Sequence, residues 1–295
     1  MSIRKAKVLG FCGGVRRAVR MIETELEERG PLHTLGAIVH NAHVVDALAA
    51  KGARMASDLD GVPDGATVAI TAHGAGEEVY AEICRRGLRL VDTTCPIVRR
   101  AQQTAAHLVE EGFAVVLYGE AEHPEVRGIL SWTRGRGVAT PSPEMEMPRS
   151  DRGIAVIAQT TKSPARFALF AQALVGKWAG TAPEIRVLDT TCPETGRRYQ
   201  AAAKLAESVD ALIVVGSRSS ANTRKLAETC RDTGVKTYSI ESATEIDSAW
   251  LRSATGFGVT AGASTPDDVI DAVVERLRAA EQRRATGSEP RSERR

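Results

Sequence analysis

Three of the five cysteines in this 295-residue chain occupy equivalent places in an internal repeat. Cys95 and Cys192 each end the sequence Asp-Thr-Thr-Cys, are each followed by proline, and lie 97 residues apart. Cys12 follows a similar apolar run, 83 residues before Cys95. An arginine pair follows each cysteine in a segment of helical character. Self-similarity of this length indicates repeated structural units.

A cysteine at the point where a strand leads into a helix can serve as a metal ligand. The helix N-terminus favours the thiolate, and proline suits the first helical position. Three thiolates at one centre would repel each other unless a cation held them. Zinc with three cysteines and a water fits this donor set, and so does an iron–sulfur cluster in which one iron lacks a protein ligand. The odd number of cysteines argues against a disulfide framework, and we expect Cys84 and Cys230 to be structural.

The repeat extends beyond the cysteines. Counting 28 residues on from each of them gives His40, His123 and Ser220. Each lies at or just after an apolar run that predicts a strand, over 37–39, 114–118 and 211–215. A further strand is expected in each unit, over 67–71, 154–157 and 257–260, before polar loops that contain His73, Thr160 and Ser264.

Short apolar strands alternate with helical segments such as 44–51 and 98–110, which is typical of βα units with parallel sheets. We therefore predict an α/β fold with three pseudo-symmetric small domains, over 12–94, over 95–188, and over 1–11 together with 189–281. The first strand joins the third domain because it matches the strands that precede the later cysteines. After a closing helix from Asp267 to Glu281, the tail 282–295 is expected to be disordered.

Ligands of open α/β sheets bind beyond the carboxyl ends of the strands, where all these polar loops are expected. Three domains around an axis would direct the loops into one cavity. The alternative is that a 28-residue period reflects only the length of an ordinary βα unit. That alternative does not explain why every unit begins with a cysteine.

The polar residues of these loops suit a phosphate or diphosphate, because they are hydrogen-bond donors near helix N-termini. The candidates are His40, His73, His123, Ser220, Asn222 and Ser264. We expect the remaining histidines, His33, His43 and His107, to be structural.

Two carboxylates flank His123, and either Glu122 or Glu125 could act as a general acid. Glu125 is the better candidate, because Pro124 would hold it in the first helical turn. A solvated glutamate at a helix start is the alternative.

Composition excludes two classes of protein. The chain has 39 basic and 37 acidic residues, which argues against a nucleic-acid binder that works through overall charge. No apolar run of about 18 residues is present, so we expect no membrane span. The residues that follow Met1 contain no secretory apolar region, and we therefore expect a cytoplasmic protein.

The motifs also resemble those of a known family, the 4-hydroxy-3-methylbut-2-enyl diphosphate reductases, over roughly residues 8 to 280. They occur in this order: 10–15 (GFCGGV), 39–41 (VHN), 72–74 (AHG), 94–96 (TCP), 123–126 (HPEV), 159–161 (QTT) and 260–264 (TAGAS). The resemblance implies three α/β domains around a 4Fe–4S cluster. By the same resemblance, the cluster ligands would be Cys12, Cys95 and Cys192.

The implied reaction is a reductive dehydroxylation. The allylic hydroxyl of the substrate would coordinate the unique iron, and the diphosphate would be held by His40, His73, His123, Ser220, Asn222 and Ser264. Ferredoxin or flavodoxin would supply two electrons. Glu125 would supply a proton through Thr160, which also contacts the substrate, and the products would be isopentenyl and dimethylallyl diphosphate.

The chain departs from the usual family pattern at two places. Glu194 and Tyr199 follow the third cysteine where alanine and glutamine are usual, and Ala221 takes the place of a serine in the phosphate loop. A paralogue that reduces a related oxygenated substrate is therefore one alternative. A non-catalytic iron–sulfur or zinc sensor is another, although a sensor would not need Glu125 and Thr160.

Overall fold

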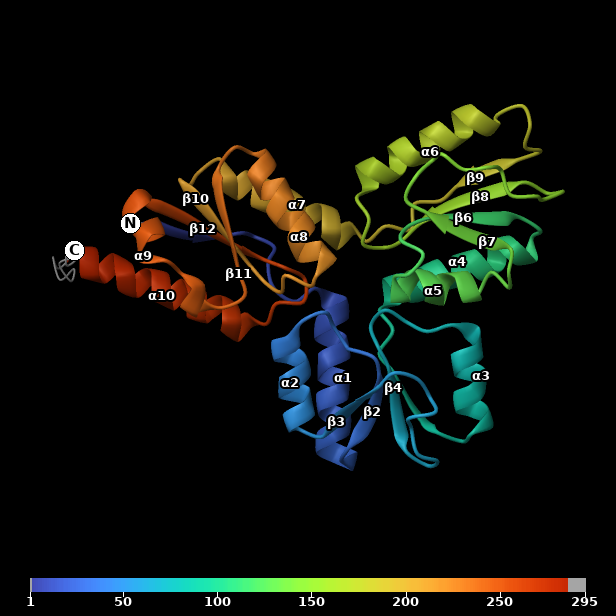
Figure 1. Ribbon diagram of the computed structural model, residues 1–295, viewed down its shortest axis with the longest axis horizontal. Helices are drawn as coiled ribbons and strands as arrows, with labels where there is room; N and C mark the ends of the chain where they lie inside the picture. Colours follow the sequence, from blue (N-terminus) through green and yellow to red (C-terminus); the bar gives the residue numbers. More distant parts are fainter. Residues whose placement is uncertain (1, 286–295) are drawn as a thin grey trace, which may run out of the picture. The chain divides into compact units, whose positions relative to one another are not determined.

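The computed structural model describes residues 2–285, and the chain forms two compact units. The smaller unit contains the residues up to Cys12 together with 40–42 and those from Arg197 onward. The larger unit contains 13–39 and 43–196. The larger unit holds two parallel sheets and the smaller unit holds one (Figure 1).

The first sheet of the larger unit has the strand order β3-β2-β4-β5, with all neighbours parallel. Its strands are β2 (Leu32–Leu35), β3 (Ala53–Ala56), β4 (Thr67–Ile70) and β5 (Arg89–Asp92). Its helices are α1 (Gly13–Arg29), α2 (Ala42–Ala50) and α3 (Glu77–Arg85). Helix α3 lies on the other side of the sheet from α1 and α2 (Figure 1).

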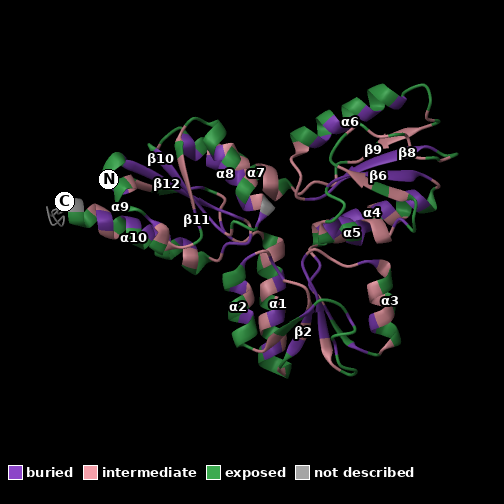
Figure 2. Ribbon diagram, viewed as in Figure 1, coloured by how far each residue is buried: buried purple, intermediate pink, exposed green. Residues whose placement is uncertain are grey.

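The second sheet of the larger unit has the order β7-β6-β8-β9 and is also parallel throughout. Its strands are β6 (Ala114–Tyr118), β7 (Gly137–Thr140), β8 (Ile154–Ala158) and β9 (Ile185–Val187). Its helices are α4 (Pro96–Glu110), α5 (Pro124–Ser131) and α6 (Pro164–Trp178). Side chains of β6 alternate between the faces: Val115 packs with α4 and α5, whereas Val116 packs with α6. Both faces are therefore buried, as is usual for a parallel sheet, and Figure 2 shows the buried strands.

The sheet of the smaller unit has the order β1-β12-β10-β11 and is parallel as well. Its strands are β1 (Ser2–Lys5), β10 (Ala211–Val215), β11 (Lys236–Ile240) and β12 (Gly256–Ala261). The helices are α7 (Pro193–Ala206), which begins in the larger unit, α8 (Ala221–Asp232), α9 (Ser248–Ser253) and α10 (Asp267–Ala285), with a short 3₁₀ turn at Ala243–Glu245. Residues of α9 and α10 pack on one face of this sheet, and residues of α7 and α8 pack on the other.

The prediction of an α/β fold with three parallel sheets is confirmed. The three sheets share one strand order. In each, the strand that precedes the cysteine lies at an edge: β1 next to β12, β5 next to β4, and β9 next to β8. The strand before Cys12 pairs with β12, with Ile3 opposite Phe257. The exact domain boundaries and the central cavity stay predictions.

One predicted strand is wrong. Residues 37–39 form a loop, because β2 ends at Leu35 and Gly36 turns the chain with a φ of +82°. Ile38 and Val39 are apolar because the loop is buried. The correction makes the repeat more regular: His40, His123 and Ser220 each lie five residues after the end of β2, β6 or β10.

Besides β2, which was expected at 37–39, three strands were not predicted from the sequence, namely β3, β7 and β11. Each lies at the outer edge of its sheet and contains exposed or half-buried residues, so its apolar signal is weak. The closing helix α10 continues to Ala285, four residues past the predicted end. The rest of the predicted tail, 286–295, lies outside the described residues.

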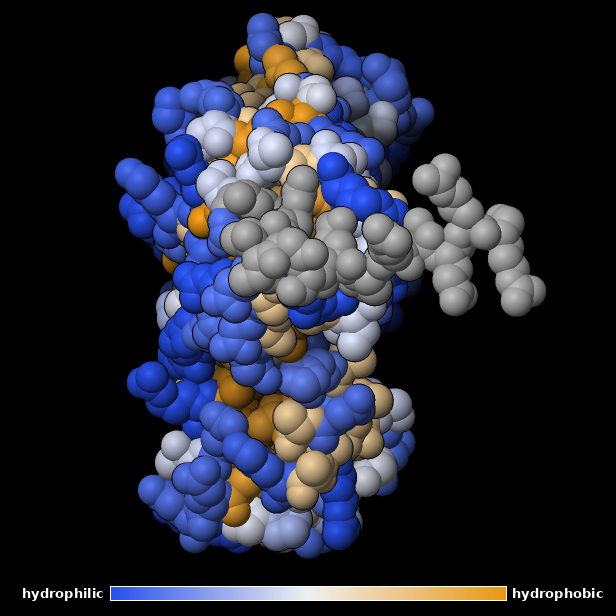
Figure 3. All heavy atoms as spheres, turned by 90° about the vertical axis from the view of Figure 1, so that its left-hand side faces the viewer, coloured by the Kyte–Doolittle hydropathy of each residue, from blue (hydrophilic) through white to orange (hydrophobic). Residues whose placement is uncertain are grey.

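None of the helices within residues 2–285 combines the length and the apolar character needed to cross a bilayer. The face drawn in Figure 3 is mostly hydrophilic, with apolar residues interspersed among the hydrophilic ones.

Candidate functional site

The three repeat cysteines share one backbone hydrogen bond. The N–H of Cys95 donates to the carbonyl of Ala72 (3.0 Å), that of Cys192 to Thr160 (2.7 Å) and that of Cys12 to Ala263 (3.1 Å). In each case the acceptor lies two residues beyond the end of the neighbouring strand. The same bond therefore ties each cysteine loop to one of the polar loops that the sequence singled out.

All three cysteines directly precede a helix. Helix α1 begins one residue after Cys12, and α4 and α7 begin with proline one residue after Cys95 and Cys192. The three side chains are half-buried, as a ligand that must contact a bound group requires. A helix N-terminus stabilises nearby negative charge, so these positions suit thiolate ligands.

The other two cysteines do not suit that role. Cys84 is exposed near the C-terminal end of α3, where the helix dipole disfavours negative charge. Cys230 is buried, and burial raises the pKa of its thiol to about 11. Cys12, Cys95 and Cys192 therefore fit a group held by three thiolates, and neither of the other two cysteines could serve as a fourth ligand of the same kind.

The structure places Cys95 and Cys192 in the larger unit and Cys12 in the smaller one. Within residues 2–285 there is no group of three or more histidine, cysteine, aspartate or glutamate side chains close enough to hold a metal ion. Convergence of the three cysteines on one centre therefore stays a prediction.

The two Asp-Thr-Thr-Cys sequences form the same local structure. The Oδ1 atom of Asp92 accepts from the N–H and the hydroxyl of Thr94, at 3.0 and 2.5 Å. Asp189 accepts in the same way from Thr191, at 2.8 and 2.6 Å. This turn lets each edge strand end in a defined geometry just before its cysteine. In the first copy Arg99 also pairs with Asp92.

Two predicted diphosphate ligands lie side by side in the larger unit. The rings of His73 and His123 meet edge to face, with centroids 5.7 Å apart. His123 is the N-cap of α5, and its Nδ1 atom accepts from the N–H of Glu125 (3.1 Å). An accepting Nδ1 leaves the proton of the neutral ring on Nε2, which can donate to an anion. Nδ1 of His73 lies 3.4 Å from the Thr71 hydroxyl.

Glu125 is the buried acid of this region. Its side chain is 1% exposed, and its Oε1 atom accepts from the N–H of Thr160 (2.6 Å). Burial raises the pKa of Glu125 to about 7, although hydrogen bonds from Thr160 and the charge of Lys162 oppose the rise. Glu122 is exposed. The burial of Glu125 keeps part of its carboxyl groups protonated near neutral pH, as a general acid requires.

The smaller unit holds the remaining predicted ligands. Ser220 is the N-cap of α8, where its side chain accepts from the N–H of Thr223 (3.3 Å), and Asn222 follows in the first turn. The hydroxyl of Ser264 donates to the backbone carbonyl of His40 (3.3 Å). Burial lowers the pKa of His40, so its imidazole is neutral at pH 7. Donors from three separate loops are thus gathered near the end of β12.

Two buried threonines close to this group have no hydrogen-bond partner for their hydroxyls within the described part of the chain. They are Thr223, in the first turn of α8, and Thr260, in β12. Buried hydroxyls are normally satisfied by protein, water or ligand. The hydroxyls of these two threonines are therefore available to hydrogen-bond a water or a ligand.

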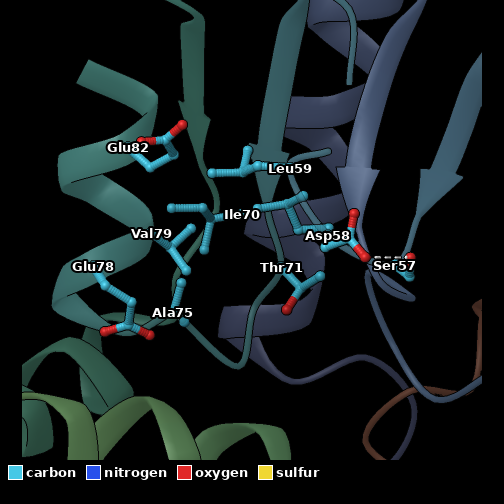
Figure 4. Close-up of a pocket in the computed structure, with 11 residues that line it drawn as sticks. Ser57, Asp58, Leu59, Ile70, Thr71, Ala75, Glu78, Val79 and Glu82 are labelled. Carbon is cyan, nitrogen blue, oxygen red and sulfur yellow. Dashed lines mark hydrogen bonds between the residues drawn. The ribbon is translucent and has the colours of Figure 1, made fainter. Parts of the chain in front are cut away.

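A cavity of about 510 Å³ lies apart from these residues, between α3 and the ends of β2 and β4 (Figure 4). Apolar side chains such as Ile70 and Val79 line it, with Glu78 and Glu82 at α3. None of the predicted site residues is among its lining residues. Thr71, which contacts His73, and Gly74, which follows it, are both among the lining residues.

Analysis of the sequence alone did not assign a role to Arg198. This side chain is 5% exposed and donates to backbone carbonyls beside the Cys12 loop. A signal was present in the repeat: the corresponding residues six positions after Cys12 and Cys95 are alanines, Ala18 and Ala101. A charged residue at a position that is apolar in the other repeats indicates a specific interaction.

Fold and site together define a class: an α/β protein of three like parallel sheets, with a cysteine after one edge strand of each sheet and a buried acid beside histidine loops. The chain matches the LytB protein family over residues 3–278 and belongs to that family.

Relatives with known names agree. The 4-hydroxy-3-methylbut-2-enyl diphosphate reductase of Dehalococcoides mccartyi strain CBDB1 is 42% identical over 279 residues, which covers 94% of this chain and 98% of the relative. A solved structure of the Plasmodium falciparum E-1-hydroxy-2-methyl-but-2-enyl-4-diphosphate reductase superposes with a TM-score of 0.85 at 27% identity, over 93% of this chain and 87% of that one. A second solved structure is an (E)-4-hydroxy-3-methyl-but-2-enyl diphosphate reductase, described as the terminal enzyme of the non-mevalonate pathway. It superposes with a TM-score of 0.73 at 34% identity, over 95% of this chain and 100% of that one.

Proposed function

We propose that this chain is an oxidoreductase of non-mevalonate isoprenoid biosynthesis that removes the allylic hydroxyl of 4-hydroxy-3-methylbut-2-enyl diphosphate. Two electrons and two protons replace the C–O bond with a C–H bond and release water. The products are isopentenyl and dimethylallyl diphosphate. Similarity to reductases of this name along 94% of the chain supports the proposal. The observation that carries it is the buried, proton-holding Glu125 bonded to the Thr160 loop that also binds Cys192.

Cys12, Cys95 and Cys192 would hold a 4Fe–4S cluster, since they are the half-buried thiols at helix N-termini. Such a cluster supplies electrons and a Lewis-acidic iron for the allylic oxygen. Backbone hydrogen bonds hold all three cysteine loops before any group binds, so little conformational entropy remains to be lost on binding.

The diphosphate would be bound by hydrogen-bond donors from the polar loops. In the larger unit, the rings of His73 and His123 are adjacent, and His123 would donate through its Nε2–H because its Nδ1 is engaged in capping α5. In the smaller unit the donors would be His40, Ser220, Asn222 and Ser264, in loops at helix N-termini. A neutral His40 would donate its ring N–H to the anion.

Glu125 would deliver the proton that lets the hydroxyl leave as water. Its pKa of about 7 means that a substantial fraction of the carboxyl groups carry a proton at neutral pH. Thr160, which is 3% exposed, would relay the proton and contact the substrate. Because Glu125 and Thr160 are buried, bulk water would be kept from protonating the substrate in their place.

The physiological electron donor, ferredoxin or flavodoxin, stays part of the proposal, as does the cytoplasmic location expected from the sequence. We expect neither nucleic acid nor membrane as a partner. A sensor without catalysis would need no buried acid beside its ligand loops, and Glu125 therefore favours an enzyme.

The test is an anaerobic turnover assay of purified protein with dithionite and a viologen mediator, comparing the standard substrate with related allylic diphosphates. We expect a brown protein that converts 4-hydroxy-3-methylbut-2-enyl diphosphate best. Glu125→Gln should retain iron and substrate binding but lose turnover by about 10²-fold or more. A colourless zinc protein would contradict the cluster. Intact iron without turnover of this substrate would contradict the reaction.

A further inference from the structure

Each cysteine loop has a second attachment to its neighbouring strand, at the residue two positions before the cysteine. In two repeats a threonine hydroxyl makes it. Thr93 donates to the carbonyl of Ile70 (2.6 Å), the last residue of β4. Thr190 donates likewise to the carbonyl of Ala158, the last residue of β8. In the first repeat this position is Gly10, which has no side chain to donate.

Gly10 cannot be replaced by a threonine in this backbone. Its φ of +71° lies in the left-handed region, which β-branched residues avoid. A Cβ atom would also lie 2.9 Å from Cδ1 of Ile270 and 3.0 Å from Oδ1 of Asp267, both on α10. The loop before Cys12 is therefore pressed against α10 and lacks the threonine attachment of the other two loops.

Arg198 supplies the missing attachment. Its Nη1 atom donates to the carbonyl of Ala261 (2.8 Å) and its Nη2 atom to the carbonyl of Gly10 (2.9 Å). Ala261 is the last residue of β12 and so corresponds to Ile70 and Ala158. The guanidinium is a rigid planar fork, so binding both carbonyls sets the distance between the strand end and the loop.

The repeat shows that the arginine is not needed for helix packing. The position six residues after the cysteine is Ala18 in α1 and Ala101 in α4, both fully buried. In α7 it is Arg198, which is 5% exposed. Burying a guanidinium costs free energy unless its donors are satisfied, so this arginine is explained by the carbonyls that it binds.

We propose that Arg198 is a positioning residue for the site, which holds the loop of Cys12 against the end of β12. The loop beyond Ala261 carries Ala263, which accepts from the N–H of Cys12 at 3.1 Å, and then Ser264. The fork therefore orders a predicted cluster ligand and a predicted diphosphate ligand together. What these loops hold rests on the proposed function, whereas the attachment itself does not.

The attachment is tested by hydrogen–deuterium exchange on the iron-free, full-length chain. In Arg198→Met we expect amides of 8–12 and 261–265 to exchange roughly tenfold faster, with 93–95 and 190–192 unchanged. Thr190→Val is the matched variant, and it should instead speed exchange around Cys192. Arg100→Met, an exposed arginine without a hydrogen bond or ion pair to any described residue, should change neither loop.

The proposal would be overturned if amides 8–12 of Arg198→Met exchanged at the same rate as those of the wild-type protein. If this variant loosens everywhere, Arg198→Lys decides, because lysine keeps the charge but cannot bridge both carbonyls. Faster exchange confined to the two loops in Arg198→Lys supports the attachment, and uniform or unchanged exchange refutes it.

The link to the site has a separate readout. After anaerobic reconstitution, Arg198→Met should bind iron less tightly and lose it to a chelator several-fold faster than Arg100→Met. Equal iron retention in the two variants, with the exchange difference present, would refute the positioning role. If the wild-type protein itself takes up no iron, the proposed function fails while the exchange result stands.

Discussion

Among single residues, Glu125 carries the most chemistry, because its environment changes its charge. Its oxygen accepts one short backbone bond from Thr160, yet the cost of burying the ionised carboxylate outweighs that bond. The pKa of Glu125 rises from 4.5 to about 7. A group that is protonated in the folded protein and ionised in the unfolded chain makes stability depend on pH.

The sign of this dependence follows from the direction of the shift. The folded protein holds the Glu125 proton more tightly than the unfolded chain, so its stabilising contribution is complete below pH 4.5 and is lost as pH rises to about 7. Glu125→Gln does not titrate. Between pH 5 and 8 the unfolding free energy of the wild type should fall relative to Glu125→Gln, by up to about 3 kcal/mol. Urea denaturation at several pH values measures the difference, and parallel curves would show that Glu125 is ionised when folded.

At the scale of elements, the helix N-termini organise the site. Cysteines precede three helices, and His123 and Ser220 cap two more. In the proposed function, residues at these positions have both a structural and a ligand role. The two roles can be separated at His123, because the cap uses Nδ1 and a ligand would use Nε2.

His123 allows that separation. Its Nδ1 atom caps α5, so Nε2–H would be the atom that donates to the proposed diphosphate. His123→Ala should lose about 1 kcal/mol of stability with the cap, together with substrate affinity. His123→Asn should keep the stability, because asparagine caps well, and still lose affinity about tenfold. Thermal unfolding and substrate calorimetry measure the two effects, and wild-type affinity in His123→Asn would remove the histidine from the diphosphate site.

Much of the architecture could be predicted because the strongest strands are buried on both faces. Runs such as 114–118 and 211–215 are continuously apolar, and their length and spacing indicate parallel βα units. The edge strands β3 and β7 could not be found this way, since they bury only part of their side chains. The loop 37–39 was misassigned because a buried loop is as apolar as a strand.

The local geometry of the site was harder to predict. The spacing of cysteines and histidines located the loops, but the role of Arg198 depends on a contact with Gly10, 188 residues away along the chain. Likewise, the pKa of Glu125 depends on burial by residues that no local pattern reveals. Such interactions follow from tertiary packing, which spacing alone does not determine.

At the scale of the whole molecule, the start of the chain completes a sheet built from its end. Ser2 and Ala6 donate their N–H groups to the carbonyls of Thr255 and Val259, so Arg4 between them is in a donating register. The strand thus delivers Cys12 to the unit that contains Ser220 and Ser264. The first strand of the chain and strand β12 therefore pair in one sheet.

A proline in this strand tests that closure. Arg4→Pro removes a ladder donor and should destabilise the smaller unit by about 3 kcal/mol, whereas Arg4→Ala should have little effect at this exposed position. Hydrogen exchange should accelerate in β10 and β12 but not in β4 or β8. Equal acceleration in both units would mean that the strand supports the whole chain and not one sheet.

The central claim is that three repeat cysteines hold one iron–sulfur cluster, and iron and sulfide content in a five-member cysteine series tests it most directly. Each of Cys12→Ser, Cys95→Ser and Cys192→Ser should lose most of the iron after anaerobic reconstitution. Cys84→Ser and Cys230→Ala should retain wild-type content, because one thiol is exposed on α3 and the other is buried and inert. Similar iron loss in all five variants, or full iron in any of the first three, would contradict the account.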